Sequence, residues 1–560
     1  MIERPWLAHY PAGVPADIDP DAIPTLPALF ERSFRQYASR TAFTFMGAAT
    51  SYAEWDRESQ ALAAWLLAHG LRPGDRVALM LPNLPQFPVA AAAVLRAGLV
   101  LVNINPLYTT RELEQQLHDS GASAIVVLEN FAHVLDHVAD RSALRQVLVT
   151  SVGDMLPAPK GQLVDFVIRH LKKAVPRYAL AGHVRLRQVL REGRKLPPPV
   201  AALQPSSLAL LQYTGGTTGV AKAAMLTHRN LIANLLQCTA WYQPALDRRP
   251  ELAQLNSACA LPLYHIFAFT IELLMSTSLG GMMVLLPNPR DLKTTLATLA
   301  RQPIHLFPAV NTLFNALLHH PDFDKVDWSQ LLLSGGGGMA VQEAVAAKWL
   351  ARTGSAICEG YGLSETSPVV SCNPTDTDHF SGTVGLPLPS TEMAILDEQG
   401  LPLGAGQIGE IGVRGPQVMA GYWQRPEESA RVFNADGWFR TGDIGVMDAQ
   451  GYFKVVDRKK DMILVSGFNV YPNEVEEIAV MHPGVLEAAV VGVPDPDSGE
   501  AVRLFVVKRD PALDEAELRA FLAERLTGYK RPKLIVFRDE LPKTAVGKIL
   551  RRALRDAGTA

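Results

Sequence analysis

Cysteine is scarce in this chain of 560 residues, which contains four cysteines and no C-x-x-C pair. Without paired cysteines the sequence indicates neither a zinc site nor a disulfide framework, so a reducing cytoplasm is the expected environment. An excess of positive charge is also lacking, since the formal net charge is −3, and no nucleic-acid partner is expected. The cysteines stand at Cys238, Cys259, Cys358 and Cys372.

Long uninterrupted apolar runs are missing as well. The N-terminal stretch, MIERPWLAHYPAGVPADIDP, holds no apolar segment of the kind that a secretory signal requires. Two stretches are rich in apolar residues, but Arg96 interrupts the first (87–104) and Glu272 interrupts the second (268–287). Each stretch is therefore predicted to be a buried helix followed by a buried strand, and not a membrane span.

Two catalytic signatures are absent or incomplete. No G-x-S-x-G segment occurs, which argues against a serine hydrolase. Of two segments that match G-x-G-x-x-G/A, residues 404–409 open no helical pattern and are predicted to form a turn. Residues 335–340 stand between an apolar run and a helical pattern. They are predicted to line a nucleotide pocket, with an NAD site as the less favoured alternative.

The sequence does contain a segment rich in glycine and threonine at residues 213–222, YTGGTTGVAK. Its three glycines let backbone N–H groups approach a ligand closely, and its three threonines add short donors. Lys222 adds a mobile cation, although the alanine after it departs from the common P-loop pattern. The composition favours polyphosphate binding, and an ordinary surface turn is the alternative.

The patterning divides the chain into parts, because 560 residues are too many for one core. Up to about residue 330, helical patterns alternate with short β-prone runs such as 76–81 and 122–128, which predicts parallel sheets covered by helices. Segments 156–161 and 196–200 are predicted to be connections. From about 383 to 457, β-prone segments and turns predict twisted antiparallel strands.

Beyond a boundary near 458–461 the chain is predicted to be a small α+β unit. Apolar periodicity predicts helices over 474–483 and 514–526, the second opened by Asp514. Continuous β-prone runs predict strands at 487–494 and 503–509.

Five segments together carry a resemblance to a known family. They read YTGGTTGVAK (213–222), EGYGLSET (359–366), GWFRTGD (437–443), DRKKDMILVSGFNVYPNEVE (457–476) and PKTAVGKILRR (542–552). In this order they resemble the acyl-adenylate-forming enzymes, which comprise acyl-CoA ligases, luciferases and peptide-synthetase adenylation domains. Further segments are similar to bacterial long-chain fatty-acid–CoA ligases, namely 261–270, 311–318, 419–428 and 526–543. The departures are small: Ala223 and Ser364 replace the family's usual glycine and threonine, and the first glycine of 335–338 is often alanine.

The resemblance implies an α/β fold. A large multi-subdomain N-terminal domain (1–457) would hold parallel sheets flanked by helices and a distorted β-barrel (about 383–457). A small mobile α+β domain (458–560) would follow, with a hinge near Lys460. The implied reaction is that of a long-chain fatty-acid–CoA ligase in fatty-acid degradation or lipid metabolism. It uses ATP and Mg²⁺ to form acyl-AMP and pyrophosphate, and then transfers the acyl group to coenzyme A.

Two other functions stay open on the residues alone. One is activation of an aryl or amino acid for a carrier protein; no carrier domain is expected after residue 560, which favours a stand-alone CoA ligase. The other is a non-catalytic nucleotide-binding scaffold. The presence of Lys548, Glu365 and Asp443 favours an active enzyme over such a scaffold.

Residue roles follow from the resemblance. Lys548 would reach the substrate carboxylate and the α-phosphate, Glu365 would help bind Mg²⁺, and His265 would gate the meeting of acyl chain and thiol. Asp443 would accept hydrogen bonds from the ribose, and Tyr361 would stack on adenine. Without the motifs, the two acids would be ordinary loop acids and His265 and Tyr361 core residues.

Contacts to ATP are implied for a larger set, which includes the glycine/threonine loop around the departing phosphates. It comprises Tyr213, Thr214, Gly215, Gly216, Thr217, Thr218, Gly219, Val220, Ala221, Lys222, Gly337, Gly338, Glu359, Gly360, Tyr361, Gly362, Ser364, Asp443, Arg458 and Lys460. Contacts to the pantetheine of coenzyme A are implied for Ser466, Gly467 and Phe468.

The segment LVDFVIRHLKKAV (163–175) alternates apolar residues at helical spacing with basic ones such as Lys172 and Lys173. This pattern predicts a helix that attaches peripherally to anionic bilayers, and a solvated basic helix packed on the body is the alternative. A homodimer and a place on the cytoplasmic face of the membrane complete the expectations for partners and localisation.

Overall fold

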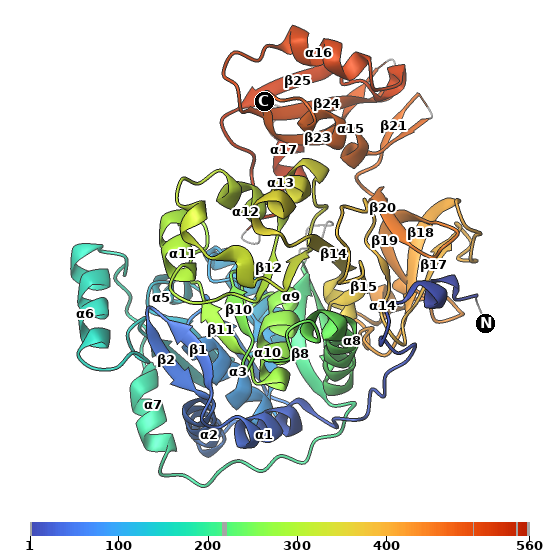
Figure 1. Ribbon diagram of the computed structural model, residues 1–560. Helices are drawn as coiled ribbons and strands as arrows, with labels where there is room; N and C mark the ends of the chain where they lie inside the picture. Colours follow the sequence, from blue (N-terminus) through green and yellow to red (C-terminus); the bar gives the residue numbers. More distant parts are fainter. Residues whose placement is uncertain (1–2, 215–220, 467, 497, 545–546, 557–560) are drawn as a thin grey trace.

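The computed structural model describes residues 3–214, 221–466, 468–496, 498–544 and 547–556. Figure 1 shows two large sheets with helices over their faces, a smaller sheet beside them, and a C-terminal unit above helices α12 (Asn311–Leu318) and α13 (Glu343–Thr353). This is the α/β arrangement that the sequence predicts.

A seven-stranded sheet has the order β7-β6-β5-β3-β4-β8-β9. Its strands are parallel except for β9, which pairs antiparallel with β8 because residues 215–221 are too few for a parallel crossover. The glycine/threonine loop therefore joins the two strands of a hairpin. The strands are β3 (Arg76–Met80), β4 (Val100–Asn103), β5 (Ala124–Leu128), β6 (Gln146–Thr150), β7 (Val184–Arg185), β8 (Leu208–Thr214) and β9 (Lys222–Thr227).

A nine-stranded sheet has the order β16-β15-β14-β13-β12-β10-β11-β1-β2. Its centre, from β14 to β1, is parallel, and antiparallel strands lie at both edges. The strands are β1 (Thr41–Phe45), β2 (Ala48–Ser51), β10 (Asn256–Cys259), β11 (Met282–Leu285), β12 (Leu306–Ala309), β13 (Leu333–Gly336), β14 (Ile357–Gly362), β15 (Val369–Cys372) and β16 (Leu386–Pro387).

Both apolar stretches fold as predicted. Residues 87–104 form α3 (Gln86–Arg96) and β4, and every residue of α3 is buried. Residues 268–287 form a π-helix, η3 (Phe269–Leu274), then α10 (Met275–Leu279) and β11. The other long helices over the sheets are α1 (Leu26–Gln36), α2 (Tyr52–Ala68), α4 (Thr110–Ser120), α7 (Leu186–Gly193), α8 (His228–Leu246) and α11 (Leu292–Leu299).

The π-helix carries an acid into the core. Glu272 is fully buried, and its Oε2 accepts a hydrogen bond of 2.5 Å from the Ser257 hydroxyl of β10. Its Oε1 has no hydrogen-bond partner among the described residues. Burial raises the pKa of Glu272 to about 8, against the smaller opposing effect of the Ser257 hydrogen bond. The side chain is therefore a neutral acid at pH 7.

Residues 383–457 form an antiparallel sheet with the order β17-β18-β19-β20. The strands are β17 (Glu392–Leu396), β18 (Ile408–Arg414), β19 (Phe439–Met447) and β20 (Phe453–Arg458). No β17–β20 ladder is present within the described residues, so the expected distorted barrel is open between these two strands. Segment 404–409 forms the predicted turn, and it ends with Ile408 and Gly409, which begin β18.

The C-terminal unit is a sheet of order β22-β21-β24-β23, with β25 parallel to β24. Its strands are β21 (Ile463–Val465), β22 (Phe468–Val470), β23 (Val485–Asp495), β24 (Gly499–Lys508) and β25 (Leu534–Arg538). Three helices pack with it, α15 (Pro472–Val480), α16 (Glu515–Ala523) and α17 (Arg551–Asp556). Asp514 caps α16 as predicted. The predicted helix 474–483 ends at Val480, before Pro483, whose preceding residue disfavours helical backbone.

Two connections bear on later arguments. Segment 156–161 is not wholly a connection, because α6 begins at Lys160 and runs to Phe166, followed by a π-helix, η2 (Val167–Leu171). The predicted connection around 196–200 is confirmed: the chain runs without a helix or strand from α7 to β8, and Val200 is 94% exposed.

Candidate active site

The carboxyl ends of β10, β11, β12 and β13 meet at one edge of the nine-stranded sheet, because these strands are parallel. Ligand sites of parallel sheets lie at this edge. A turn of the C-terminal unit is docked there, and it is described at Thr544, Gly547 and Lys548. The Thr544 N–H donates to the Lys548 carbonyl (2.7 Å), and the Thr544 hydroxyl oxygen accepts from the Lys548 N–H (3.1 Å).

Lys548 is half-buried where this turn docks. Gly338, just after β13, lies so close that a Cβ there would be 3.3 Å from the Lys548 Cε. Gly547, at φ +84°, has no room for a Cβ because Thr312 Oγ1 would be 2.9 Å away. Burial and the nearby Arg458 lower the pKa of Lys548 to about 8, against the opposing fields of Asp443 and Glu365. The structure thus brings the predicted lysine to the predicted acids.

Asp443 and Tyr361 form a second part of the site. Asp443 lies on β19 opposite Arg458 of β20, and the Arg458 Nε is 3.3 Å from the Asp443 Oδ1. The Tyr361 hydroxyl on β14 donates to the Asp443 Oδ2 at 2.6 Å. Burial and the neighbouring carboxylate raise the pKa of Tyr361 well above its usual value. The tyrosine is therefore tied to the proposed ribose-binding acid across two sheets.

Glu365 lies in a short 3₁₀ helix, η6 (Ser364–Thr366), which packs against β8 and β9. Its Oε1 accepts a hydrogen bond of 2.8 Å from the Tyr422 hydroxyl. Burial raises the pKa of this carboxyl.

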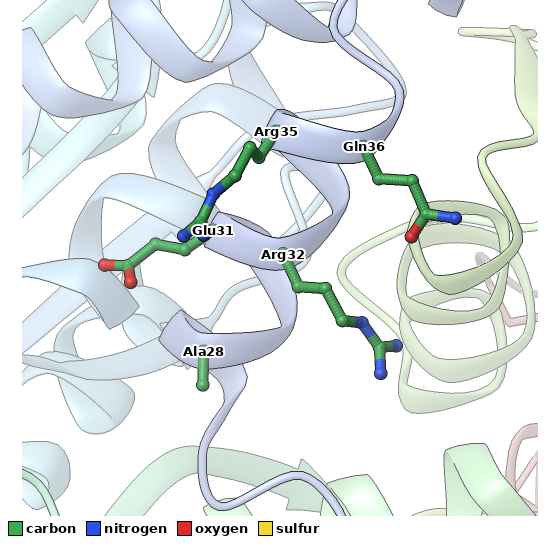
Figure 2. A pocket seen from close by; sticks show the side chains of 5 residues that line it. All are labelled: Ala28, Glu31, Arg32, Arg35 and Gln36. Carbon is green, nitrogen blue, oxygen red and sulfur yellow. The ribbon is translucent and has the colours of Figure 1, made fainter.

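Beside Glu365 is a hollow of about 330 Å³, lined in part by Tyr422, Arg440 and Lys459. A second hollow, shown in Figure 2, is lined by residues of α1 alone and contains no residue of the site: Ala28, Glu31, Arg32, Arg35 and Gln36.

The residues that flank the glycine/threonine loop are bound by side chains from other segments of the chain. The Tyr213 hydroxyl donates to Asp119 Oδ2 at 2.7 Å, and Lys222 pairs with Glu428 while its Nζ lies 5.4 Å from the Tyr422 ring centre. Thr214 ends β8, and Ala221 is exposed. The predicted phosphate contacts Gly215, Gly216, Thr217, Thr218, Gly219 and Val220 lie outside the described residues.

The segment predicted to form a nucleotide wall has the predicted strand–turn–helix form, β13 followed by α13. The Val341 N–H in this turn donates to Glu359 Oε1 at 3.1 Å, and burial raises the pKa of Glu359 to about 8. Gly337 faces the ring of Phe267. The remaining predicted ATP contacts nearby are in β14 and at the start of η6, namely Gly360, Gly362 and Ser364.

His265 begins α9 (Ile266–Ala268), where its Nδ1 accepts from the Phe267 N–H at 3.3 Å. Burial and the charge of Lys548 lower its pKa to about 3, so the imidazole is neutral at pH 7. A neutral ring with Nδ1 as acceptor carries its proton on Nε2.

Of the predicted coenzyme A residues, Ser466 and Phe468 contact other residues of the C-terminal unit. Ser466 follows β21 and donates its N–H to the Ser498 carbonyl, and the Phe468 ring stacks on Tyr529 at 4.8 Å. Gly467 lies outside the described residues. Lys460 is exposed just after β20, and partial desolvation of its ammonium group lowers its pKa.

Sequence reasoning missed the residues that support the site. Asp119, Tyr422, Glu428 and Arg290 each contact a predicted residue or its turn. Tyr422 and Glu428 belong to a segment that carries the family resemblance, which was a usable signal. Asp119 and Arg290 lie in no such segment.

No cluster of three or more His, Cys, Asp or Glu side chains that could hold a metal exists among the described residues. A single buried carboxylate, Glu365, is nevertheless what Mg²⁺ requires from the protein when substrate phosphates supply its other ligands. Glu365 therefore fits a ligand of Mg²⁺ that is bound together with substrate phosphates.

Parallel sheets with Tyr361, Asp443 and Glu365 at the strand ends, and a lysine brought there by a C-terminal unit, are the arrangement that the resemblance implies for an adenylate-forming enzyme. The sequence model of AMP-binding enzymes matches residues 30–423, and that of the AMP-binding enzyme C-terminal domain matches 474–548. The chain belongs to the AMP-binding enzyme family.

Curated relatives match over nearly the whole chain. A long-chain-fatty-acid–CoA ligase of Escherichia coli O157:H7 is 53% identical, covering 99% of this chain and 98% of that protein. The ligase of the same description from Bacillus subtilis (strain 168) is 40% identical, covering 100% and 98%. A feruloyl-CoA synthase of Amycolatopsis sp is 36% identical, covering 94% and 97%.

Solved structures share the fold at lower identity. An anthranilate CoA ligase in complex with anthranoyl-AMP superposes with a TM-score of 0.83 at 25% identity, covering 97% of this chain and 99% of that chain. ATP-bound MatB from Rhodopseudomonas palustris has a TM-score of 0.80 at 30% identity, covering 94% and 98%.

Proposed function

We propose that this chain is an AMP-forming long-chain fatty-acid–CoA ligase. The observation that carries the proposal is 53% identity over 99% of the chain to a curated ligase of that description. The packing of Lys548 at Gly338, with the acids Glu365 and Asp443 near it, supports the chemistry. ATP, coenzyme A and a fatty acid are the corresponding substrates.

The residues of the site account for the first half-reaction. A fatty carboxylate attacks the α-phosphate of ATP, and the bond to pyrophosphate breaks. Lys548 places a cation where negative charge shifts during this step. Asp443 accepts hydrogen bonds from the ribose hydroxyls, and Arg458 contacts ribose or phosphate. Glu365 would hold Mg²⁺, which neutralises phosphate charge when bound.

The second half-reaction transfers the acyl group from AMP to the coenzyme A thiol. We assign the pantetheine channel to Ser466, Gly467 and Phe468, and the hinge of the C-terminal domain to Lys460, with a boundary between residues 457 and 458. Two poses of this domain, one for each half-reaction, are supported by the docking of the Thr544 and Lys548 turn at the sheet edge while Phe468 stacks on Tyr529 of its own unit. The neutral His265, between the apolar Tyr264 and Phe267, is suited to gating the acyl chain.

Chain length tests the substrate class. The acyl region offers apolar side chains in 264–269 and 313–318, so specificity constants should rise from acetate to medium and long acyl chains by about 100-fold or more. Each buried CH₂ contributes roughly 0.8 kcal/mol, which is several-fold per methylene. Acyl-CoA formation from acids of increasing length measures this.

An aromatic acid is the relevant control, since a feruloyl-CoA synthase is among the relatives. Equal or higher specificity constants for acetate or ferulate than for palmitate would contradict the proposal.

We further propose that the α6–η2 element attaches the enzyme peripherally to anionic membranes. Leu163, Phe166 and Leu171 are 63%, 52% and 67% exposed, and α6 stands away from the sheets in Figure 1. Arg169 points inward instead, with two hydrogen bonds to the buried Glu129, so the element is fixed to the body. Exposed apolar side chains on a basic element suit an interfacial helix. No helix in the described part of the chain could span a bilayer.

The helix is shorter than its sequence predicts. It ends at Leu171, and Lys173 has φ +50°, three residues before Pro176, which cannot continue a helix. Val175 therefore lies beyond it, while Lys172 and Lys173 follow its end directly.

Charge reversal at Lys172 and Lys173 should lower binding to anionic liposomes at least tenfold, because each basic residue near such a surface contributes about 1 kcal/mol. Co-sedimentation with vesicles of rising phosphatidylglycerol content measures this. Reversal of Lys348 on α13 and Lys454 on β20, two exposed cations away from α6, is the matched control. Binding that ignores both lipid charge and Lys172/Lys173 would refute the attachment. A homodimer stays a prediction for sedimentation measurements.

A further inference from the structure

We propose that Arg290 is a positioning residue for acyl-AMP formation, which holds the turn that carries Lys548 against the large domain. The role lies within the ligase reaction and therefore rests on the proposed function. Arg290 itself need not touch the reacting atoms, because it acts on the backbone of the neighbouring turn.

Arg290 is presented from a fixed point of the sheet. It stands in the loop after β11, directly before Asp291, whose carboxylate accepts from the Thr294 N–H at 3.1 Å and so caps α11. This loop is at the same sheet edge as His265, Thr312 and Gly338, which follow β10, β12 and β13. The edge thus surrounds the docked turn with residues from four successive loops.

The contact itself is a charge-assisted hydrogen bond between the two parts of the molecule. The Arg290 Nη2 donates to the backbone carbonyl of Thr544 at 2.9 Å. Thr544 is bonded to Lys548 twice, through its N–H and through its hydroxyl, so its position fixes that of the lysine. A guanidinium that binds the Thr544 carbonyl therefore fixes the main chain of Lys548 indirectly, through Thr544.

The other described contacts of the turn are weaker. The Thr312 hydroxyl is 3.5 Å from the Gly547 carbonyl, at the outer limit of a hydrogen bond, and Gly338 offers van der Waals contact to the Lys548 side chain. Hydrogen bonds from an ionised donor are roughly twice as strong as neutral ones. Arg290 is accordingly the residue whose loss should most loosen the turn without altering the nucleotide-binding acids.

The bond also depends on the pose of the C-terminal domain. It joins the β11–α11 loop to residue 544, so it can form only while the turn is docked at the sheet edge. The Arg290–Thr544 hydrogen bond should therefore assist acyl-AMP formation, which needs Lys548. It should not affect the thioester step, which needs the other pose.

Arg290→Ala should lower the rate constant of acyl-AMP formation about tenfold, measured as pyrophosphate release with saturating ATP and palmitate. Thioester formation from supplied palmitoyl-AMP and coenzyme A should stay within about twofold of the wild-type rate. Arg290→Lys should recover part of the loss, since an ammonium group can also donate to the carbonyl. Lys293→Ala, which removes an exposed cation three residues further on, should leave both rates unchanged.

A double-mutant cycle separates positioning from a general structural role. In a Lys548→Ala background, Arg290→Ala should have no further effect on acyl-AMP formation, because the group that it positions is gone. Additive losses in this cycle, equal losses in both half-reactions, a loss confined to the thioester step or an unchanged adenylation rate would each overturn the inference. Failure of the proposed function is distinguishable, because the wild-type enzyme would then form no palmitoyl-CoA at all.

Discussion

Replacement of Lys548 by alanine should slow acyl-AMP formation by about 10²–10³-fold and leave most of the thioester step intact. The ammonium group is held beside Gly338, at the edge of the sheet where the nucleotide is proposed to bind. Removal of one preorganised electrostatic donor from a site that excludes water typically costs about 3–4 kcal/mol in the transition state. In the thioester step the leaving group is AMP, and the domain is expected to have turned away.

Each half-reaction can be measured alone, with pyrophosphate release for the first and thioester yield from supplied acyl-AMP for the second. The wild-type rate of acyl-AMP formation at low ATP should also fall as the pH rises through about 8, where Lys548 loses its proton, and the variant should lack this fall. Equal loss of both half-reactions in a folded variant would contradict the division of labour.

Replacement of Glu272 by glutamine should remove a pH-dependent loss of stability of a few kcal/mol. The folded-state pKa is about 8, against 4.5 for the free side chain. Below pH 4.5 the acid is neutral in both states. Between pH 4.5 and 8 the unfolded chain releases the proton and the folded chain keeps it, so the free energy of unfolding falls by up to about 1.4 kcal/mol per pH unit.

Thermal unfolding of the two proteins between pH 5 and 8.5 measures this effect. The glutamine variant should match the wild type near pH 5, where Glu272 is neutral in the folded protein and resembles an amide. It should be the more stable protein at pH 8.5. Parallel stability curves over the whole interval would show that the core tolerates the charged acid.

The sequence predicts well those features that repeat locally or that belong to a motif. The alternation of residue types gives α3 with β4 and β13 with α13, and a single capping residue, Asp514, gives the start of α16. Motifs likewise point to Lys548, although 183 positions separate it from Glu365 along the chain. The motifs carry this information because each one sets residue types at fixed positions, whatever the length of chain between the motifs.

Features set by packing between distant segments were not predictable. The π-helix that aims Glu272 at Ser257 depends on how η3 lies on the sheet, and its residues alone fit an ordinary helix. Tyr213 belongs to a phosphate-loop motif, yet its hydroxyl is bonded to Asp119, 94 positions away. Arg290 donates to the backbone carbonyl of residue 544, which any residue type would offer. The identity of the residue at 544 therefore does not indicate this contact.

The connection from α7 to β8 has a consequence for engineering. It is exposed at Val200, and β8 returns from it to pair with β4 inside a sheet whose first five strands come from before the connection. Exposed loops of this kind tolerate cuts and insertions. A chain divided there would consist of two fragments that complete one another's hydrogen-bonded sheet. The connection around Val200 is therefore a suitable cut site for a split reporter. Association of the two fragments would rebuild the sheet, and enzyme activity would report that association.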